Sequence, residues 1–187
     1  MTISTLDPKT ALILIDLQKG IVSVPTVHPI ETVLKHAAAL TDAFRRHRLP
    51  VVIVNVTGGA PGRTELTRNR GELPPDWSDL VPEFNPRPED HRVTKRTWGA
   101  FTNTDLDAYL KKRDITQVVV AGVATSMGVE STARYAYELG YNVTLAIDAM
   151  TDRNIEVHAN SIGRIFPKLG ETGTTQEILD LLEKTHA

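Results

Sequence analysis

The chain alternates between short, wholly apolar runs and longer segments in which apolar residues recur every three or four positions. Unbroken apolar runs are typical of strands buried on both faces, as in a parallel sheet. They predict strands at 11–16, 51–56, 117–122 and 142–150, with a further short strand and turn within 91–101. Helical spacing predicts helices over 30–47, from Asn103 or Thr104 to Arg113, over 128–139, over 154–166 and over 175–184.

This alternation predicts an α/β fold, in which right-handed βαβ units build a parallel sheet with helices on both faces. The length of 187 residues fits one domain spanning 1–187. The segment from Thr57 to Pro88 is rich in glycine and proline and has little periodicity. Long irregular segments in compact domains are usually functional, so we expect a loop insertion at about 57–90 that faces the active site.

Composition removes several functional classes. The net charge of −2 argues against nucleic acid as a partner. The absence of cysteine removes disulfides, thiolate metal sites and thiol nucleophiles. The N-terminal residues contain no basic region followed by a long apolar run, and the first apolar run is too short for a signal peptide or a membrane span. We therefore expect a cytoplasmic protein without a membrane partner.

Three polar features fall at the carboxyl ends of predicted strands, where open parallel sheets bind ligands. They are Asp16, Lys95 and the small-residue turn from Gly122 to Gly128. Taken singly, the aspartate could be a turn residue and the lysine a solvated charge. On neighbouring strand ends they form a candidate acid–base pair, in which burial would raise the pKa of Asp16 and the lysine would lower it. Backbone N–H groups of the turn could hold a carbonyl oxygen.

Familiar motifs are absent or weak. The turn "GVATSMG" fits neither the dinucleotide fingerprint nor the serine-hydrolase elbow, so Thr125 and Ser126 are weak candidates for a nucleophile. The six histidines are scattered without metal-ligand spacing, which predicts no metal. Trp98 and Phe101 flank Lys95 and fit pocket walls or core packing equally well. Three arginines of the irregular segment could bind a substrate carboxylate or simply be solvated: Arg63, Arg68 and Arg70.

Four stretches of the chain resemble the isochorismatase-like hydrolase superfamily, which also contains nicotinamidases and other cysteine hydrolases. They are "ALILIDLQKG", "KRTWGAFTNTDLDAYL", "VVVAGVATSMGVESTARYAYELGYNVTLAIDAMTD" and "RIFPKLGETGTTQEIL". The resemblance covers nearly the whole chain in order and spacing. It implies a flavodoxin-like three-layer α/β/α sandwich around a mainly parallel sheet.

The resemblance also assigns roles to individual residues. In the cysteine members a triad of Asp, Lys and Cys is catalytic; Asp16 and Lys95 match the first two, and the cysteine position falls on Gly128. Isochorismatases proper also lack the cysteine and cleave a vinyl ether. By that likeness Asp16 would be a general acid, Lys95 would orient it or the substrate, and the turn near Ala124 and Gly128 would position the substrate. A cis peptide bond is implied before Ala124.

The resulting hypothesis is a hydrolase of a small, anionic substrate that works without a thiol and without a cofactor. Its catalytic residues would be Asp16 and Lys95, and its substrate contacts Gly128, Ala124, Trp98, Phe101 and Arg63. The alternative is a catalytically degenerate binding or scaffold protein of the same fold. A phosphoacceptor receiver domain fits poorly, since "LIDLQ" supplies one acid and "VIVNV" none. The resemblance further implies a homo-oligomer, either a dimer or a tetramer.

Overall fold

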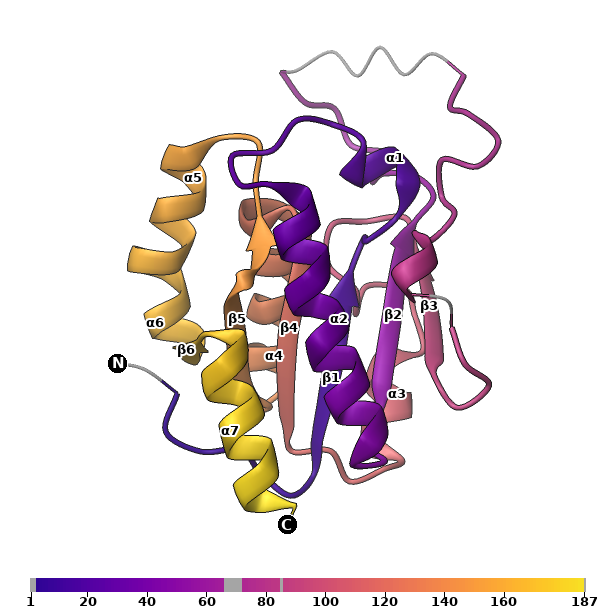
Figure 1. Cartoon of the computed structure of the whole chain (residues 1–187). Helices are drawn as coiled ribbons and strands as arrows, with labels where there is room; N and C mark the ends of the chain where they lie inside the picture. The colour runs from indigo at the N-terminus through magenta and orange to yellow at the C-terminus, as the bar shows by residue number, and fades with distance from the viewer. Residues whose placement is uncertain (1–2, 66–71, 85, 187) are drawn as a thin grey trace.

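The computed structural model describes residues 3–65, 72–84 and 86–186 and contains a six-stranded sheet in the order β3-β2-β1-β4-β5-β6. Every pair of adjacent strands is parallel. The strands are β1 (Thr10–Ile15), β2 (Val51–Val56), β3 (His91–Lys95), β4 (Gln117–Val123), β5 (Asn142–Thr151) and β6 (Glu171–Gly173). The parallel α/β fold predicted from the sequence is therefore confirmed (Figure 1).

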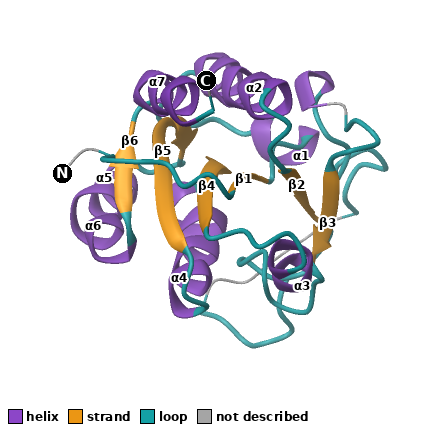
Figure 2. Cartoon of the chain, turned by 90° about the horizontal axis from the view of Figure 1, so that it is seen from below, coloured by secondary structure: helices purple, strands orange, loops and turns teal. Residues whose placement is uncertain are grey.

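Helices cover both faces of the sheet and complete a three-layer sandwich (Figure 2). On one face lie α1 (Lys19–Val22), α2 (Ile30–Arg46) and α7 (Thr175–Thr185). The other face carries α3 (Leu106–Lys111) and α4 (Glu130–Glu138), and α5 (Ile155–Asn160) and α6 (Phe166–Leu169) lie beside them near β6. A separate buried apolar cluster fills the space on each side of the sheet.

The central strands form as predicted because their runs are buried on both faces. Residues Ala11–Ile15 and Val118–Ala121 are fully buried. Gly122 is required where β4 passes β1: its φ is +123°, and a Cβ there would lie 2.1 Å from the carbonyl oxygen of Ile15. This close approach places the turn after β4 directly beside the end of β1.

Several predicted boundaries were wrong. The helix after β4 does not begin at Gly128, because residues Thr125–Val129 form a wider π-helical turn before α4. The segment 154–166 contains α5, a second π-helical turn (Ser161–Ile165) and the start of α6 instead of one helix. The strand β6 and the short helices α1 and η1 (Pro82–Phe84) were not predicted.

The irregular segment after β2 leaves the edge of the sheet at which the strands end (Figure 1). Its described part packs over the residues that follow β1. The N–H of Gly20 donates to the carbonyl of Trp77, Lys19 forms ion pairs with Asp76 and Asp79, and Gln18 bridges to Leu80. Part of this segment therefore covers the carboxyl end of β1.

Candidate functional site

The carboxyl edge of the sheet brings two of the predicted residues into direct contact. The Nζ of Lys95 donates to Oδ2 of Asp16 at 2.7 Å, and both side chains are buried, at 1% and 8% exposure. The sequence predicted that the two strands would be neighbours, and this was wrong, because β2 lies between β1 and β3. The long side chain of Lys95 reaches across the intervening strand to Asp16.

Lys95 has all three of its hydrogens engaged. Besides Asp16, its ammonium donates to the carbonyl oxygens of Thr97 at 3.2 Å and Trp98 at 2.8 Å. An ammonium has three donors and no acceptor, so this lysine is saturated and held in one position. It serves as a fixed positive charge beside the carboxyl group.

Asp16 is only half satisfied. Its Oδ2 accepts from Lys95, but its Oδ1 is buried without a hydrogen-bond partner. Burial raises the pKa of Asp16 to about 6, because the loss of water outweighs the attraction of Lys95. Its φ of +52° is unusual for a residue other than glycine. A strained, half-satisfied carboxyl group is typical of a functional site.

Gly128 lies directly beside the pair formed by Asp16 and Lys95. A Cβ at this position would lie 3.2 Å from Oδ2 of Asp16 and 3.6 Å from Nζ of Lys95. A side chain at 128 would therefore meet both charged groups, and glycine allows the turn to pack closely against them. The same Cβ would lie 2.8 Å from Cγ2 of Ile15, so even a methyl group requires a shift.

The turn that carries Gly128 is fixed from three elements. Asp152, after β5, accepts from both the N–H and the hydroxyl of Ser126 at 2.8 Å. His158, on α5, is 2.9 Å from the hydroxyl of Thr125. Thr132 donates to the carbonyl of Gly128 at 2.7 Å. Sequence inspection missed these supporting residues, since none of them belongs to a local motif.

The turn offers fewer free N–H groups than the sequence suggested. The N–H groups of Met127 and Val129 both donate to the carbonyl of Ala124, and that of Ser126 donates to Asp152. These three amides are engaged inside the protein. The peptide bond between Val123 and Ala124 is cis, as the resemblance implied.

Gln18 is a further residue that sequence inspection missed. Its side chain is fully buried, accepts from the N–H of Val56 at 2.7 Å and donates to the carbonyls of Val56 and Trp77. It therefore joins the segments that follow β1 and β2. The signal was available, because an amide two residues after Asp16 at a buried strand end needs a partner.

The remaining candidates fall in different places. Trp98 is half exposed, at 51%, and joins the site through its carbonyl group. Phe101 lies instead in the core, at 8% exposure, with its ring 6.1 Å from that of Tyr141, so core packing accounts for it. Arg63 is exposed in the segment after β2. Arg68 and Arg70 lie outside the described residues.

No group of three or more His, Asp or Glu side chains is arranged to hold a metal ion within residues 3–65, 72–84 and 86–186. In the same ranges, no helix has both the length and the apolar character that crossing a membrane requires.

Comparison with known proteins agrees with this geometry. Residues 10–177 match the isochorismatase domain. The chain belongs to the isochorismatase family. It is 43% identical to YwoC of Bacillus subtilis, an uncharacterized isochorismatase family protein, over 92% of this chain and 93% of that one. It is 37% identical to the uncharacterized family member YecD of Escherichia coli O157:H7, over 92% and 96%.

A solved structure of an isochorismatase family protein from Burkholderia thailandensis has the same architecture. The TM-score is 0.93 at 41% identity, over 97% of this chain and 100% of that one. The family and the resemblance inferred from the sequence are therefore confirmed, and the protein is a hydrolase of this family. Its chain contains no cysteine, and Gly128 stands where a side chain would face Asp16 and Lys95.

Proposed function

We propose that this protein hydrolyses a small, anionic substrate by acid–base chemistry of Asp16 and Lys95, without a covalent thiol intermediate. The observation that carries the proposal is the buried Asp16, whose Oδ1 has no partner and whose pKa is raised to about 6. A carboxyl group with such a pKa keeps roughly a tenth of its molecules protonated at pH 7, far more than an ordinary aspartate, and can act as a general acid.

Hydrolysis of a vinyl ether fits this arrangement best. The difficult step of that reaction is transfer of a proton to the terminal carbon of the double bond, which needs an acid and no nucleophilic side chain. Asp16 would give its proton to that carbon and form an oxocarbenium ion. Water would then add to the adjacent carbon and lose a proton, and the resulting hemiketal would break down to a carbonyl compound and an alcohol.

Lys95 would stabilise the carboxylate that remains after the proton has left. Its ammonium is already 2.7 Å from Oδ2 of Asp16 and is held by two carbonyl groups, so it needs no rearrangement as charge develops. The turn at Gly128, which lies against Asp16, would contact the substrate. Trp98 and Arg63 are proposed to contact the substrate, with Arg63 binding its carboxylate.

The test is a panel of vinyl-ether, ester and amide substrates that includes isochorismate, with Asp16→Asn as the inactive control. In D₂O, protonation at carbon places one deuterium on the carbon that was the terminus of the double bond, which mass spectrometry of the product detects. Turnover of a vinyl ether with this label, lost in Asp16→Asn, supports the proposal. Equal turnover by Asp16→Asn contradicts the role proposed for Asp16. No turnover of any substrate in the panel, while substrates still bind, contradicts the proposal and favours a binding protein.

A further inference from the structure

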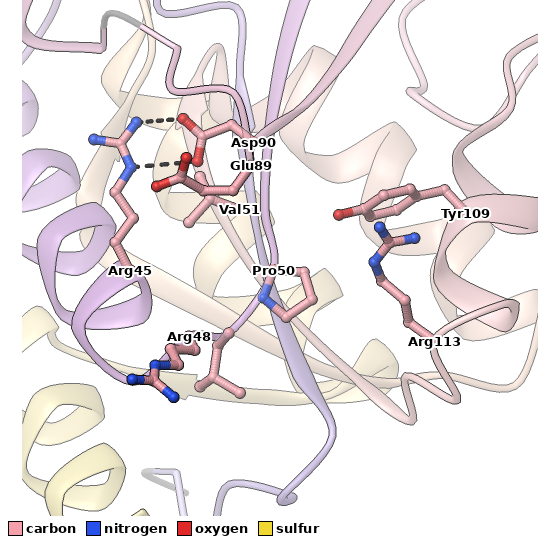
Figure 3. Close-up of a pocket in the computed structure, with 9 residues that line it drawn as sticks. Arg45, Arg48, Pro50, Val51, Glu89, Asp90, Tyr109 and Arg113 are labelled. Carbon is pink, nitrogen blue, oxygen red and sulfur yellow. Dashed lines mark hydrogen bonds and ion pairs between the residues drawn. The ribbon is translucent and has the colours of Figure 1, made fainter.

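A cavity lies at the edge of the sheet where the strands begin, opposite to Asp16 and Lys95. Its volume is about 370 Å³, and its floor is Leu49, Pro50 and Val51 at the start of β2. One wall comes from the C-terminal end of α2 and the other from the residues of α3 and just after it (Figure 3). The cavity therefore shares no residue with the pair formed by Asp16 and Lys95.

Cationic side chains stand on both sides of this cavity. Arg48 follows α2, and Arg113 follows α3 and lies with its guanidinium 3.9 Å from the centre of the Tyr109 ring. Neither arginine forms an ion pair with a carboxylate in the part of the chain that the structure describes. Arg45, by contrast, is paired with Asp90.

The lining has a net positive charge. Arg45 and Asp90 cancel each other, the charges of Arg48 and Arg113 add, and the exposed Glu89 supplies one negative charge. Pro50 and its neighbours supply an apolar surface between the charged groups. A cavity of this kind suits an organic anion better than a bare inorganic ion.

Tyr109 points its hydroxyl group toward the cavity (Figure 3). Both faces of its ring are in contact with planar groups. The centroid of the His91 ring lies 3.7 Å from that of the Tyr109 ring, and the guanidinium carbon of Arg113 lies 3.9 Å from the Tyr109 centroid. The ring is therefore fixed, and its hydroxyl is the part available to a ligand.

Arg48 occupies a backbone position that favours glycine. Its φ is +58°, directly after the end of α2, where glycine is the usual residue because a Cβ is unfavourable in the left-handed region. Arginine at this position does not help the helix to end. A ligand-binding role in the cavity would explain an arginine at this position, because Arg48 lines the cavity.

We propose that this cavity binds a small organic anion. The carboxylate of the ligand contacts Arg113, its apolar part lies on Pro50 and its neighbours, and a hydrogen-bond donor at its other end meets Glu89. Arg48, on the other side of the cavity, adds to the attraction of the anion. Arginine pairs with a planar carboxylate through two parallel hydrogen bonds, which favours a carboxylate over a spherical ion. This proposal does not depend on the chemistry proposed for Asp16.

The test is titration of the wild-type protein with benzoate, 4-hydroxybenzoate and neutral benzyl alcohol at constant ionic strength, followed by amide shifts in NMR. Benzoate is expected to bind with a Kd on the order of 1 mM, as its few heavy atoms allow. Benzyl alcohol is expected to bind at least about tenfold more weakly. Shifts are expected at residues around Pro50 and Tyr109.

Four variants separate the site from general charge effects. Arg113→Gln is expected to weaken benzoate about tenfold and Arg48→Gly about threefold, and Arg48→Gly is expected to keep or raise Tm, since glycine suits its backbone. Glu89→Gln is expected to tighten benzoate and to remove any advantage of 4-hydroxybenzoate. Arg46→Ala, which removes a charge from the same helix end outside the cavity, is expected to change Kd by less than about twofold.

Absence of saturable benzoate binding would overturn the proposal. So would equal losses in Arg46→Ala and Arg48→Gly, or shifts confined to the surroundings of Asp16. Since none of these measurements uses turnover, failure here leaves the assignment of Asp16 untouched, and failure of the activity panel leaves this cavity untouched.

Discussion

Within the described residues, two buried ion pairs lie at opposite edges of one sheet, and the pair at the carboxyl edge has a carboxylate oxygen without a hydrogen-bond partner. At the amino edge, Arg45 contacts both oxygens of Asp90, and the N–H of Arg87 adds a further bond at 2.7 Å. At the carboxyl edge, Asp16 leaves Oδ1 without a partner. The two pairs therefore differ in one atom: Oδ1 of Asp16 has no hydrogen-bond partner, whereas both carboxylate oxygens of Asp90 are engaged.

The pairs also differ in what surrounds them. Asp90 lines a cavity of about 370 Å³, whereas Asp16 lies against Gly128, where an added Cβ would be only 2.8 Å from Cγ2 of Ile15. Burial costs free energy for both pairs, and full hydrogen bonding offsets it only for Asp90. The variants below test this difference, from the largest expected effect to the smallest.

Replacement of each aspartate by asparagine gives the largest contrast. Asp16→Asn is expected to lower kcat/KM of the substrate identified in the panel by about 10²- to 10⁴-fold, the usual contribution of a general acid. Asp90→Asn, as the matched control, is expected to retain turnover, because it lies at the far edge of the sheet. Comparable losses of activity in the two variants would show that the loss reports damaged folding and not acid catalysis.

Replacement of each cation by methionine tests the stability of the pairs. Lys95→Met and Arg45→Met each leave a buried carboxyl group without its partner, so each is expected to lower the free energy of unfolding by about 3–5 kcal/mol in urea titrations near pH 8. At pH 4 the loss in Lys95→Met is expected to shrink, because Asp16 is then protonated. A loss in Lys95→Met that does not change between these pH values would contradict the raised pKa.

The pH dependence of stability gives an independent measure of the same shift. The pKa of Asp16 is 3.8 in the unfolded chain and about 6 in the folded protein, so folding favours its protonated form. This stabilisation is complete below pH 3.8 and is lost as the pH rises through 6, by on the order of 3 kcal/mol. Relative to Asp16→Asn, the wild type should therefore become less stable between pH 4 and 7. If the difference in free energy of unfolding between wild type and Asp16→Asn stays constant over this range, or changes in favour of the wild type, the raised pKa is contradicted.

Adding a side chain at Gly128 has the smallest expected effect on stability. Gly128→Ala places a methyl group 2.8 Å from Ile15 Cγ2, and overpacking of this kind costs about 1–3 kcal/mol. Gly163→Ala is the matched control, since a Cβ there meets nothing within 4 Å. Thermal unfolding should show a lower Tm for the first variant only. An unchanged Tm in Gly128→Ala would contradict this prediction, because it would mean that the Ile15 side chain moves aside without loss of stability.

The strands of the sheet were predictable because burial on both faces leaves an unbroken apolar run, as in β2, whose bounds were predicted to the residue. The short β6 was not, since three residues carry no periodicity. The start of the helix after β4 was misplaced for another reason. Its π-helical geometry depends on contacts from Asp152 and His158, which come from later parts of the chain.

The sequence was sufficient to select Asp16 and Lys95 as the candidate pair, but not to predict which oxygen of Asp16 has no partner. The positions of Asp16 and Lys95 follow from the rule that ligands bind at the carboxyl ends of parallel strands. Which oxygen of Asp16 is free depends on the direction from which Lys95 arrives across β2, and no local pattern records that. The cavity at the amino edge was equally hidden, because its walls come from segments about sixty residues apart, around Arg48 and Arg113.

The most direct test of the account is the titration of Asp16 itself, followed through the ¹³C shift of its carboxyl carbon by NMR. Asp16→Asn identifies the signal, and Asp90 serves as the internal comparison. The account predicts a midpoint of about 6 for Asp16 in the wild-type protein and a higher one in Lys95→Met, where the attraction of the ammonium is lost. A midpoint at or below the ordinary 3.8 would show that Asp16 is a permanently ionised partner of Lys95 and not an acid.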